Sequence, residues 1–158
     1  MRAILLAGFF ALAFTLCVGS GGRAAPARSP YATYHADMLY VTPYVTQVAM
    51  SIGDYQPAPS PGNEYLLVWI QAINRNDVPM YTTDREFHIV SADGQLIDPG
   101  FSRPDPSYSG HTLVPGGIAK GKIAFEVRKG THRTTMRWVP DSHWTDLTWP
   151  TFSWALRY

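Results

Sequence analysis

Three residues with metal-ligand side chains, Asp84, Glu86 and His88, recur at every second position of one segment. Alternate residues of a β-strand lie on one face, about 7 Å apart, so the three side chains would project together. Carboxylates and imidazole bind zinc and calcium, but one strand does not enclose an ion, and no further residue is marked to complete the shell. We therefore predict a solvated strand face without a metal.

Residues of the types used in nucleophilic catalysis occur twice, as Ser142 and His143 near Asp146, and as Ser109 near His111. Triads are defined by geometry, and the chain has no Gly-x-Ser-x-Gly motif. Nothing marks a glycosidase pair of carboxylates or a glycine-rich phosphate loop. We therefore predict a protein that is not an enzyme and that has no cofactor.

Cations alternate along two segments that are predicted to be consecutive strands. Lys120, Lys122 and Arg128 lie on the first segment, and Arg133 and Arg137 on the second. If the strands pair as a hairpin, the five cations share one sheet surface, which could contact an anionic polymer of an envelope or a host. The alternative is a solvated face that resists aggregation.

The strongest apolar run after the N-terminal segment is residues 63–76, which we predict to be the central strand. Its two faces are both largely apolar, with Val68, Ile70 and Ala72 on one and Leu67, Trp69 and Ile73 on the other. The second face would leave a large apolar patch if it stayed in water. We predict that the tail from Trp144 to Tyr158 completes a sheet and covers this face, or that a partner chain, as in a homodimer, docks there.

The candidate interaction surface therefore joins the outer face of the central strand to the cations. It comprises Trp69, Leu67, Ile73, Lys120, Lys122, Arg128, Arg133 and Arg137. The formal net charge of only +1 excludes the general basic excess of a nucleic-acid-binding protein.

The N-terminal segment is typical of export. Arg2 precedes an apolar stretch over residues 3–18 and a small-residue stretch that ends at Ala25, so we predict a signal peptide over residues 1–25. Two alternatives are an uncleaved anchor, although a membrane span needs about 20 apolar residues, and lipidation of Cys17, which the preceding Leu16 fits poorly. Cleavage would leave a secreted or cell-envelope protein with no stable membrane span and, because Cys17 is the only cysteine, no disulfide.

The elements that position these residues are short strands separated by turns. Residues 26–43 are predicted to be a lead-in with a possible first strand, and residues 44–158 to be one immunoglobulin-like β-sandwich domain. Ala92–Gln95 reads as a hairpin turn, residues 98–110 as a long crossover, and Gly121 as a β-bulge or a point of close backbone approach. Without a helical window, seven or eight such strands predict an all-β fold, an antiparallel immunoglobulin-like β-sandwich.

Three motifs occur in a recognisable order. They are a strand ending in Asn (65–74), Phe-His-Ile closed by Asp-Gly (87–94), and Leu-x-Pro-Gly-Gly followed by Gly-x-Ile-x-Phe-Glu-Val (113–127). Their order resembles a bacterial family of secreted domains of unknown function, similar in fold to telokin and to the mycobacterial immunoprotective extracellular antigen, over roughly residues 45–139. Family members often have Pro where this chain has Arg128. The resemblance implies export, an immunoglobulin-like sandwich and no known catalysis, and it assigns no functional residue.

The sequence thus predicts a secreted, non-catalytic binding domain whose partner is an unidentified protein or an envelope or host polymer. A carbohydrate-binding module with exposed tryptophans and an exported enzyme with a hidden site are the alternatives. A row of exposed aromatic rings would favour the first alternative, and a deep polar pocket the second.

Overall fold

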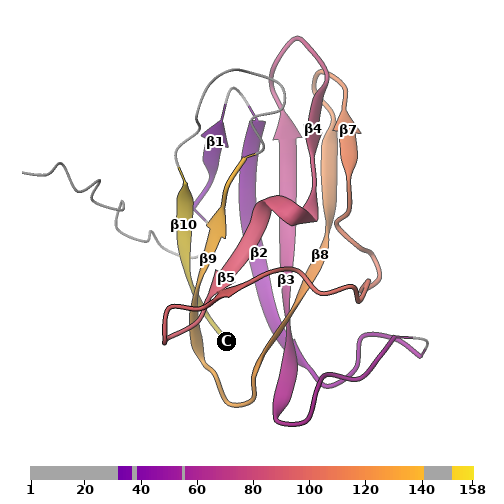
Figure 1. Ribbon diagram of the computed structural model, residues 1–158. Helices are drawn as coiled ribbons and strands as arrows, with labels where there is room; N and C mark the ends of the chain where they lie inside the picture. The colour runs from indigo at the N-terminus through magenta and orange to yellow at the C-terminus, as the bar shows by residue number, and fades with distance from the viewer. Residues whose placement is uncertain (1–31, 37–38, 55, 141–150) are drawn as a thin grey trace, which may run out of the picture.

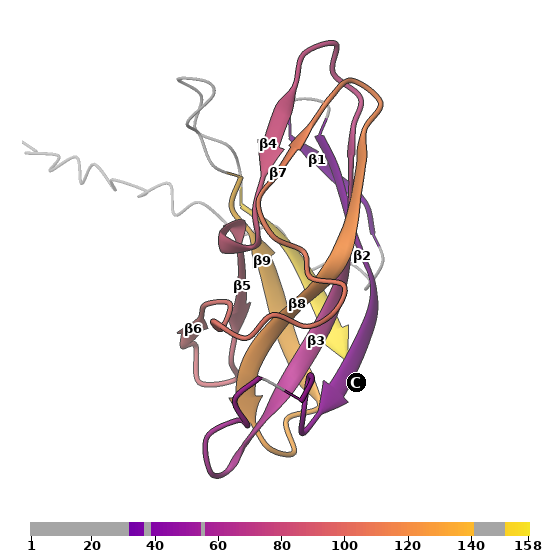
Figure 2. The same cartoon turned by 90° about the vertical axis from the view of Figure 1, so that its right-hand side faces the viewer.

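The computed structural model describes residues 32–36, 39–54, 56–140 and 151–158 (Figure 1). The described strands are β1 (Tyr34–Ala36), β2 (Leu39–Ala49), β3 (Asn63–Asn74), β4 (Met80–Thr82), β5 (Phe87–Val90), β6 (Leu96–Ile97), β7 (His111–Leu113), β8 (Ile118–Arg128), β9 (Arg133–Trp138) and β10 (Phe152–Arg157), with one 3-10 helix, η1 (Asp84–Glu86). Two four-stranded sheets, β1-β2-β3-β8 and β10-β9-β5-β6, form the layers seen in Figures 1 and 2, and β4 pairs with β7. The predicted antiparallel β-sandwich is confirmed. Its first sheet begins before residue 44, the boundary expected from the sequence.

The predicted central strand is confirmed as β3, which pairs with β2 along one edge and with β8 along the other. Its inward side chains, including Leu66, Val68 and Ile70, are fully buried in the core. Asn74 ends the strand because its side-chain amide donates to the carbonyl oxygens of Val78 and Leu113, each at 2.8 Å. This buried amide joins two loops at one end of the sandwich and gives the terminal Asn of the sequence motif a physical role.

The hairpin that would bring the five cations together does not form between β8 and β9. β8 pairs with β3, whereas β9 pairs with β5 and β10 in the other sheet. The turn at Gly130, whose φ is +81°, carries the chain from one layer to the other. This arrangement lets the apolar faces of both strands, represented by Phe125 and Trp138, meet in the core. The five cations therefore do not share one sheet.

The crossover from β6 to β7 covers the free edge of β8. Gly100 donates its backbone N–H to Ala124 O at 3.0 Å, and Tyr108 donates to Lys122 O at 2.9 Å. A Cβ at Gly121 would lie 2.6 Å from the carbonyl carbon of Ser107, so the predicted close backbone approach is confirmed. The crossover thus pairs an edge strand that would otherwise be open to another chain.

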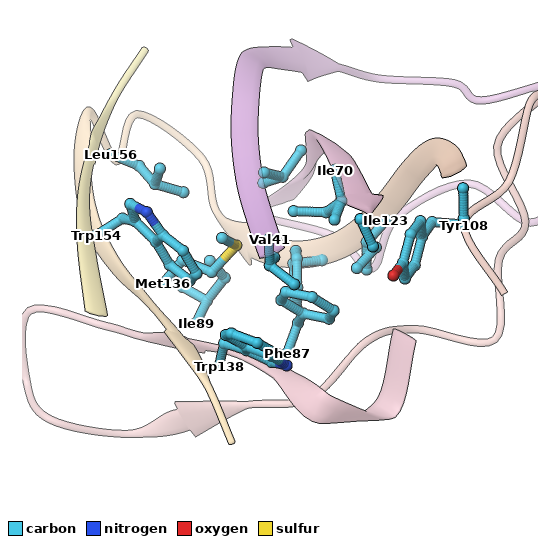
Figure 3. Packing of buried hydrophobic residues seen from close by; sticks show 14 of the residues in the cluster. Val41, Ile70, Phe87, Ile89, Tyr108, Ile123, Met136, Trp138, Trp154 and Leu156 are labelled. Atoms are coloured by element: carbon cyan, nitrogen blue, oxygen red, sulfur yellow. The ribbon is translucent and has the colours of Figure 1, made fainter. Parts of the chain in front are cut away.

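The tail prediction is confirmed in one part. Strand β10 completes the second sheet beside β9, and Trp154 and Leu156 lie in the core (Figure 3). Trp154 packs between the sheets and therefore does not cover the outer face of β3. The other tail residues of that prediction, 144–149, lie outside the described residues, as does the whole leader. Within the described part of the chain, no helix has the length and apolar character needed to cross a membrane.

Candidate functional site

The outward side chains of β1, β2, β3 and β8 form a surface that we name the aromatic face. Antiparallel register aligns them in rows, with Tyr40 beside Ile73 and Ile118, and Thr42 beside Gln71 and Lys120. The aromatic face comprises His35, Tyr40, Thr42, Tyr44, Trp69, Gln71, Ile73, Arg75, Ile118, Lys120 and Lys122.

Trp69 is the centre of one group on this face, in which a second aromatic ring and a cation contact the indole. The ring of Tyr44 lies 5.7 Å from it at an interplanar angle of 41°, and the ammonium of Lys122 lies 4.9 Å from its centroid. The register of β2 shifts between Pro43 and Val45, and Tyr44 lies in that irregularity. Lys122 is held in place because its Nζ also donates to the carbonyl oxygen of Asp105. Trp69 keeps part of its surface in solvent.

Tyr40 is the centre of a second group. The ring of His35 stacks on it with centroids 5.2 Å apart at 28°, and the guanidinium carbon of Arg75 lies 5.3 Å from its centroid. Aromatic and cation contacts of this kind are worth about 0.5–1 kcal/mol at exposed sites. The two groups flank the polar row of Thr42, Gln71 and Lys120.

Arg75, Lys120 and Lys122 give the aromatic face three cations, and the outward carboxylate of β8, Glu126, lies beyond Lys122, where it accepts hydrogen bonds from Ser60 N and Asn63 Nδ2. The Tyr44 hydroxyl is protonated at neutral pH and can donate, and burial raises its pKa further above the ordinary 10.0. The face thus offers aromatic rings, neutral hydrogen-bonding groups and positive charge on one sheet surface.

The structure brings together only some of the predicted surface residues. Trp69, Ile73, Lys120 and Lys122 lie on the aromatic face, and Arg128 lies at the far end of the same side of β8. Arg133 and Arg137 lie on the outer face of the other sheet.

Leu67 is wrongly predicted as surface, because only 5% of it is exposed. It packs with Tyr65 and Ala124 beneath Ala49 and Ile52. The Tyr65 hydroxyl donates to the carbonyl oxygen of Pro57 at 2.9 Å and lies 3.0 Å from the Ser102 hydroxyl. Residues of β2 and the following loop therefore cover this end of the strand.

The prediction of a solvated face at Asp84, Glu86 and His88 is wrong for the two acids, each only 5% exposed. The segment forms the 3-10 helix η1 before β5 begins, so alternate side chains do not share a face. Asp84 forms an ion pair with Arg103. His88 Nδ1 lies 2.8 Å from a carboxylate oxygen of Asp98.

Glu86 is held inside the molecule. Its carboxylate accepts hydrogen bonds from Thr82 Oγ1 at 3.2 Å and from Trp138 Nε1 at 3.1 Å. Asp84, Glu86 and His88 thus have separate protein partners. No group of three metal-ligand side chains is found in the described ranges.

Only one of the two sets of nucleophile-type residues lies in the described chain. His111 Nε2 is buried without a hydrogen-bond partner, and its ring lies edge-on to Tyr108. Ser142, His143 and Asp146 lie outside the described residues.

Sequence reasoning missed Tyr40, Tyr44 and His35 as members of the face. The Tyr40-x-Thr42-x-Tyr44 alternation was a visible signal for outward rings. Only the pairing of β2 with β3 shows that these rings flank Trp69 and Ile73.

The fold is similar to solved bacterial β-sandwich proteins at low sequence identity. A candidate lipoprotein (ycdA) of Bacillus subtilis superimposes with a TM-score of 0.65 at 16% identity, over 82% of this chain and 39% of that one. The secreted protein MPT63 of Mycobacterium tuberculosis gives a TM-score of 0.56 at 14% identity, over 81% and 95% of the two chains. An uncharacterised β-sandwich protein of Clostridium difficile gives 0.51 at 6% identity, over 84% and 97%. At these identities the likeness shows the fold alone, and this chain spans well under half of the Bacillus protein.

No curated protein matches the sequence. A family model does match, and it covers residues 35–147, most of the described chain. The resemblance that the three motifs indicated is thereby confirmed. The chain belongs to the family described as Domain of unknown function (DUF4352).

Proposed function

We propose that this chain is an exported, non-catalytic binding domain whose aromatic face binds an acidic polysaccharide. The observation that carries the proposal is the pairing of Trp69 with Lys122 and of Tyr40 with Arg75 on one sheet surface. Each pair places an aromatic ring beside a cation, and the outward carboxylate of β8, Glu126, is already bonded to Ser60 and Asn63.

The shape of the surface favours an extended ligand. Small-molecule sites are concave and largely apolar, whereas the aromatic face is a sheet surface whose groups run across four strands. Ring faces can stack on the apolar faces of sugars, Thr42 and Gln71 can hydrogen-bond to hydroxyls, and Lys120 with Lys122 can meet acidic groups. One polymer chain could use all three kinds of contact.

Two observations support export. The sequence predicts a signal peptide over residues 1–25, and the structural neighbours include a secreted protein and a candidate lipoprotein. An exported domain meets the acidic polymers of an envelope or of its surroundings.

The test is affinity electrophoresis of the purified protein through gels that contain polygalacturonate, heparin or neutral dextran. We expect retardation in the acidic gels, weakened at least about tenfold in Trp69→Ala, with salt reducing the binding. Phe101→Ala is the matched control, because Phe101 is fully exposed and lies outside the aromatic face. Equal retardation of the two variants, or none with any acidic polymer, would overturn the proposal.

A protein interface is the competing use of the same face. Sedimentation of the full chain separates it from polymer binding: a stable homodimer that Trp69→Lys dissociates would show that a second copy covers the face. That result would replace the polysaccharide proposal.

A further inference from the structure

The outer face of the second sheet carries a hollow of about 470 Å³, which we name the arginine hollow. It crosses the ends of three neighbouring strands, β5, β9 and β10. Its lining residues are Val90, Ser91, Ala92, Arg133, Thr134, Thr135, Ala155, Leu156 and Arg157.

The floor of the hollow follows from small side chains in one cross-strand row. Thr135 lies opposite Val90 on one side and opposite Ala155 on the other. The row on one side carries Arg133 and Arg157, and the row on the other carries His88 and Arg137, so longer side chains stand on both sides of this row. The Thr135 hydroxyl belongs to an outward position and supplies a hydrogen-bonding group in the floor.

Two arginines stand directly opposite each other at the rim. Arg133 and Arg157 are register partners across β9 and β10, so their Cα atoms lie about 5 Å apart. Like charges in this position destabilise a sheet unless something lies between them. None of the lining residues is acidic.

A third cation lies one row away on the same face. Arg137 is two residues beyond Thr135 and pairs in register with His88 and Ser153. Two carboxylates lie close to residues of this face, and each has another partner: Asp98 contacts His88 at 2.8 Å, and Asp93 accepts a hydrogen bond from the hydroxyl of Ser91. Three arginines therefore surround the hollow, and none of its lining residues is an acid.

We infer that the arginine hollow binds a phosphate or sulfate group, with the guanidinium groups of Arg133 and Arg157 donating to its oxygens and Thr135 lying beneath it. The planar fork of arginine matches two oxygens of such a group, and an anion between the pair removes their mutual repulsion. This site lies on the opposite sheet from the aromatic face and does not depend on the polysaccharide proposal. The group could belong to a soluble molecule or to an anionic lipid headgroup.

The test is a nuclear magnetic resonance titration of the purified protein with inorganic phosphate and then sulfate, at constant ionic strength. We expect saturable shifts of the Thr135 and Ala155 amides. Arg133→Gln/Arg157→Gln should weaken the affinity at least about tenfold, as expected for loss of charged hydrogen bonds. Arg157→Gln alone should weaken it more than Arg85→Gln, which removes one exposed charge outside the hollow.

Small shifts that do not saturate, or equal affinity in the wild type and the double variant, would overturn the inference. Sedimentation with vesicles of phosphatidylcholine, with and without phosphatidylglycerol, identifies the source of the group. Arginine-dependent pelleting with phosphatidylglycerol assigns it to a lipid headgroup. Saturable phosphate binding without pelleting assigns it to a soluble molecule. No outcome of these tests changes the interpretation of the Trp69→Ala experiment, because the two sites lie on different sheets.

Discussion

Positive charges have different neighbours on the two outer faces of this sandwich. On the aromatic face, Lys122 lies over the ring of Trp69 and Arg75 over the ring of Tyr40, so two of its three cations have a π partner. On the other sheet, Arg133 and Arg157 face each other across two strands above small side chains. The comparison indicates a surface filled by its own side chains on one side and a surface that an anion would complete on the other.

The difference begins in the strands themselves. β3 is central in its sheet and apolar on both faces, so its outer side chains need large neighbours such as Tyr44 to limit their exposure. β9 alternates apolar with polar residues, and its outward positions need no cover. Charge on that side is therefore free to serve a ligand.

The largest expected loss of stability comes from a core substitution in β10, the strand that supplies Ala155 and Arg157 to the arginine hollow. Trp154→Ala should lower the free energy of unfolding by about 3–5 kcal/mol, since Trp154 is fully buried in the core. Urea denaturation measures the loss. Phe101→Ala, at a fully exposed ring, should change stability by less than about 0.5 kcal/mol. A similar small loss for both variants would show that β10 is not needed for the sandwich.

A smaller loss of stability should follow from a substitution in β8, the edge strand that the crossover covers. A Cβ at Gly121 would clash with the backbone of Ser107 and Tyr108, so Gly121→Ala should cost about 1–3 kcal/mol. Gly100→Ala is the matched control on the same crossover, because its Cβ would find ordinary contacts at 3.7 Å. Equal thermal unfolding midpoints for the two variants would contradict the close approach of crossover and β8.

Alkaline pH should loosen the link between the two sheets at Tyr108. Burial strongly raises the pKa of its hydroxyl above the ordinary 10.0, and the ring lies edge-on to Phe87 at 5.8 Å. The unfolded chain therefore releases this proton at a lower pH than the folded chain does. The stabilisation is complete below pH 10 and declines above it, by up to about 1.4 kcal/mol per pH unit.

Urea unfolding between pH 8 and pH 11 measures that slope. Tyr108→Phe removes the titrating group and should flatten the slope, although the lost hydrogen bond to Thr82, 2.8 Å in the wild type, lowers its stability throughout. Parallel curves for wild type and variant would assign the alkaline loss to other groups.

The smallest effects should differ in sign between the two faces. Lys122→Gln should lower stability by about 0.5–1 kcal/mol through loss of the contact with Trp69. Arg157→Gln should raise it by a few tenths of a kcal/mol, because it removes a repulsive cross-strand pair. Chemical denaturation in low salt measures both. Equal losses of stability in the two variants would contradict the proposed difference between the two faces.

Local pattern was enough to predict the strands and their turns. A continuous apolar run marked β3, period-two alternation marked β8, and Asp93-Gly94 marked a turn in which Gly94 has a φ of +83°. Such features depend on neighbours in sequence, since strand periodicity and positive φ are properties of a few consecutive residues. The fold class followed from the number and alternation of these segments.

Contacts between residues distant in sequence determined the features that local pattern could not predict, namely the 3-10 helix, the strand pairing and the two candidate sites. Asp84 to Glu86 left the predicted strand because Glu86 bonds the indole of Trp138, 52 positions away. Strand alternation states which face a side chain takes, but not which strand lies beside it. Only pairing in the folded sheets placed Tyr44 against Trp69 and Arg157 opposite Arg133. Both candidate sites are therefore products of register, which is set by burial of the whole core rather than by any one segment.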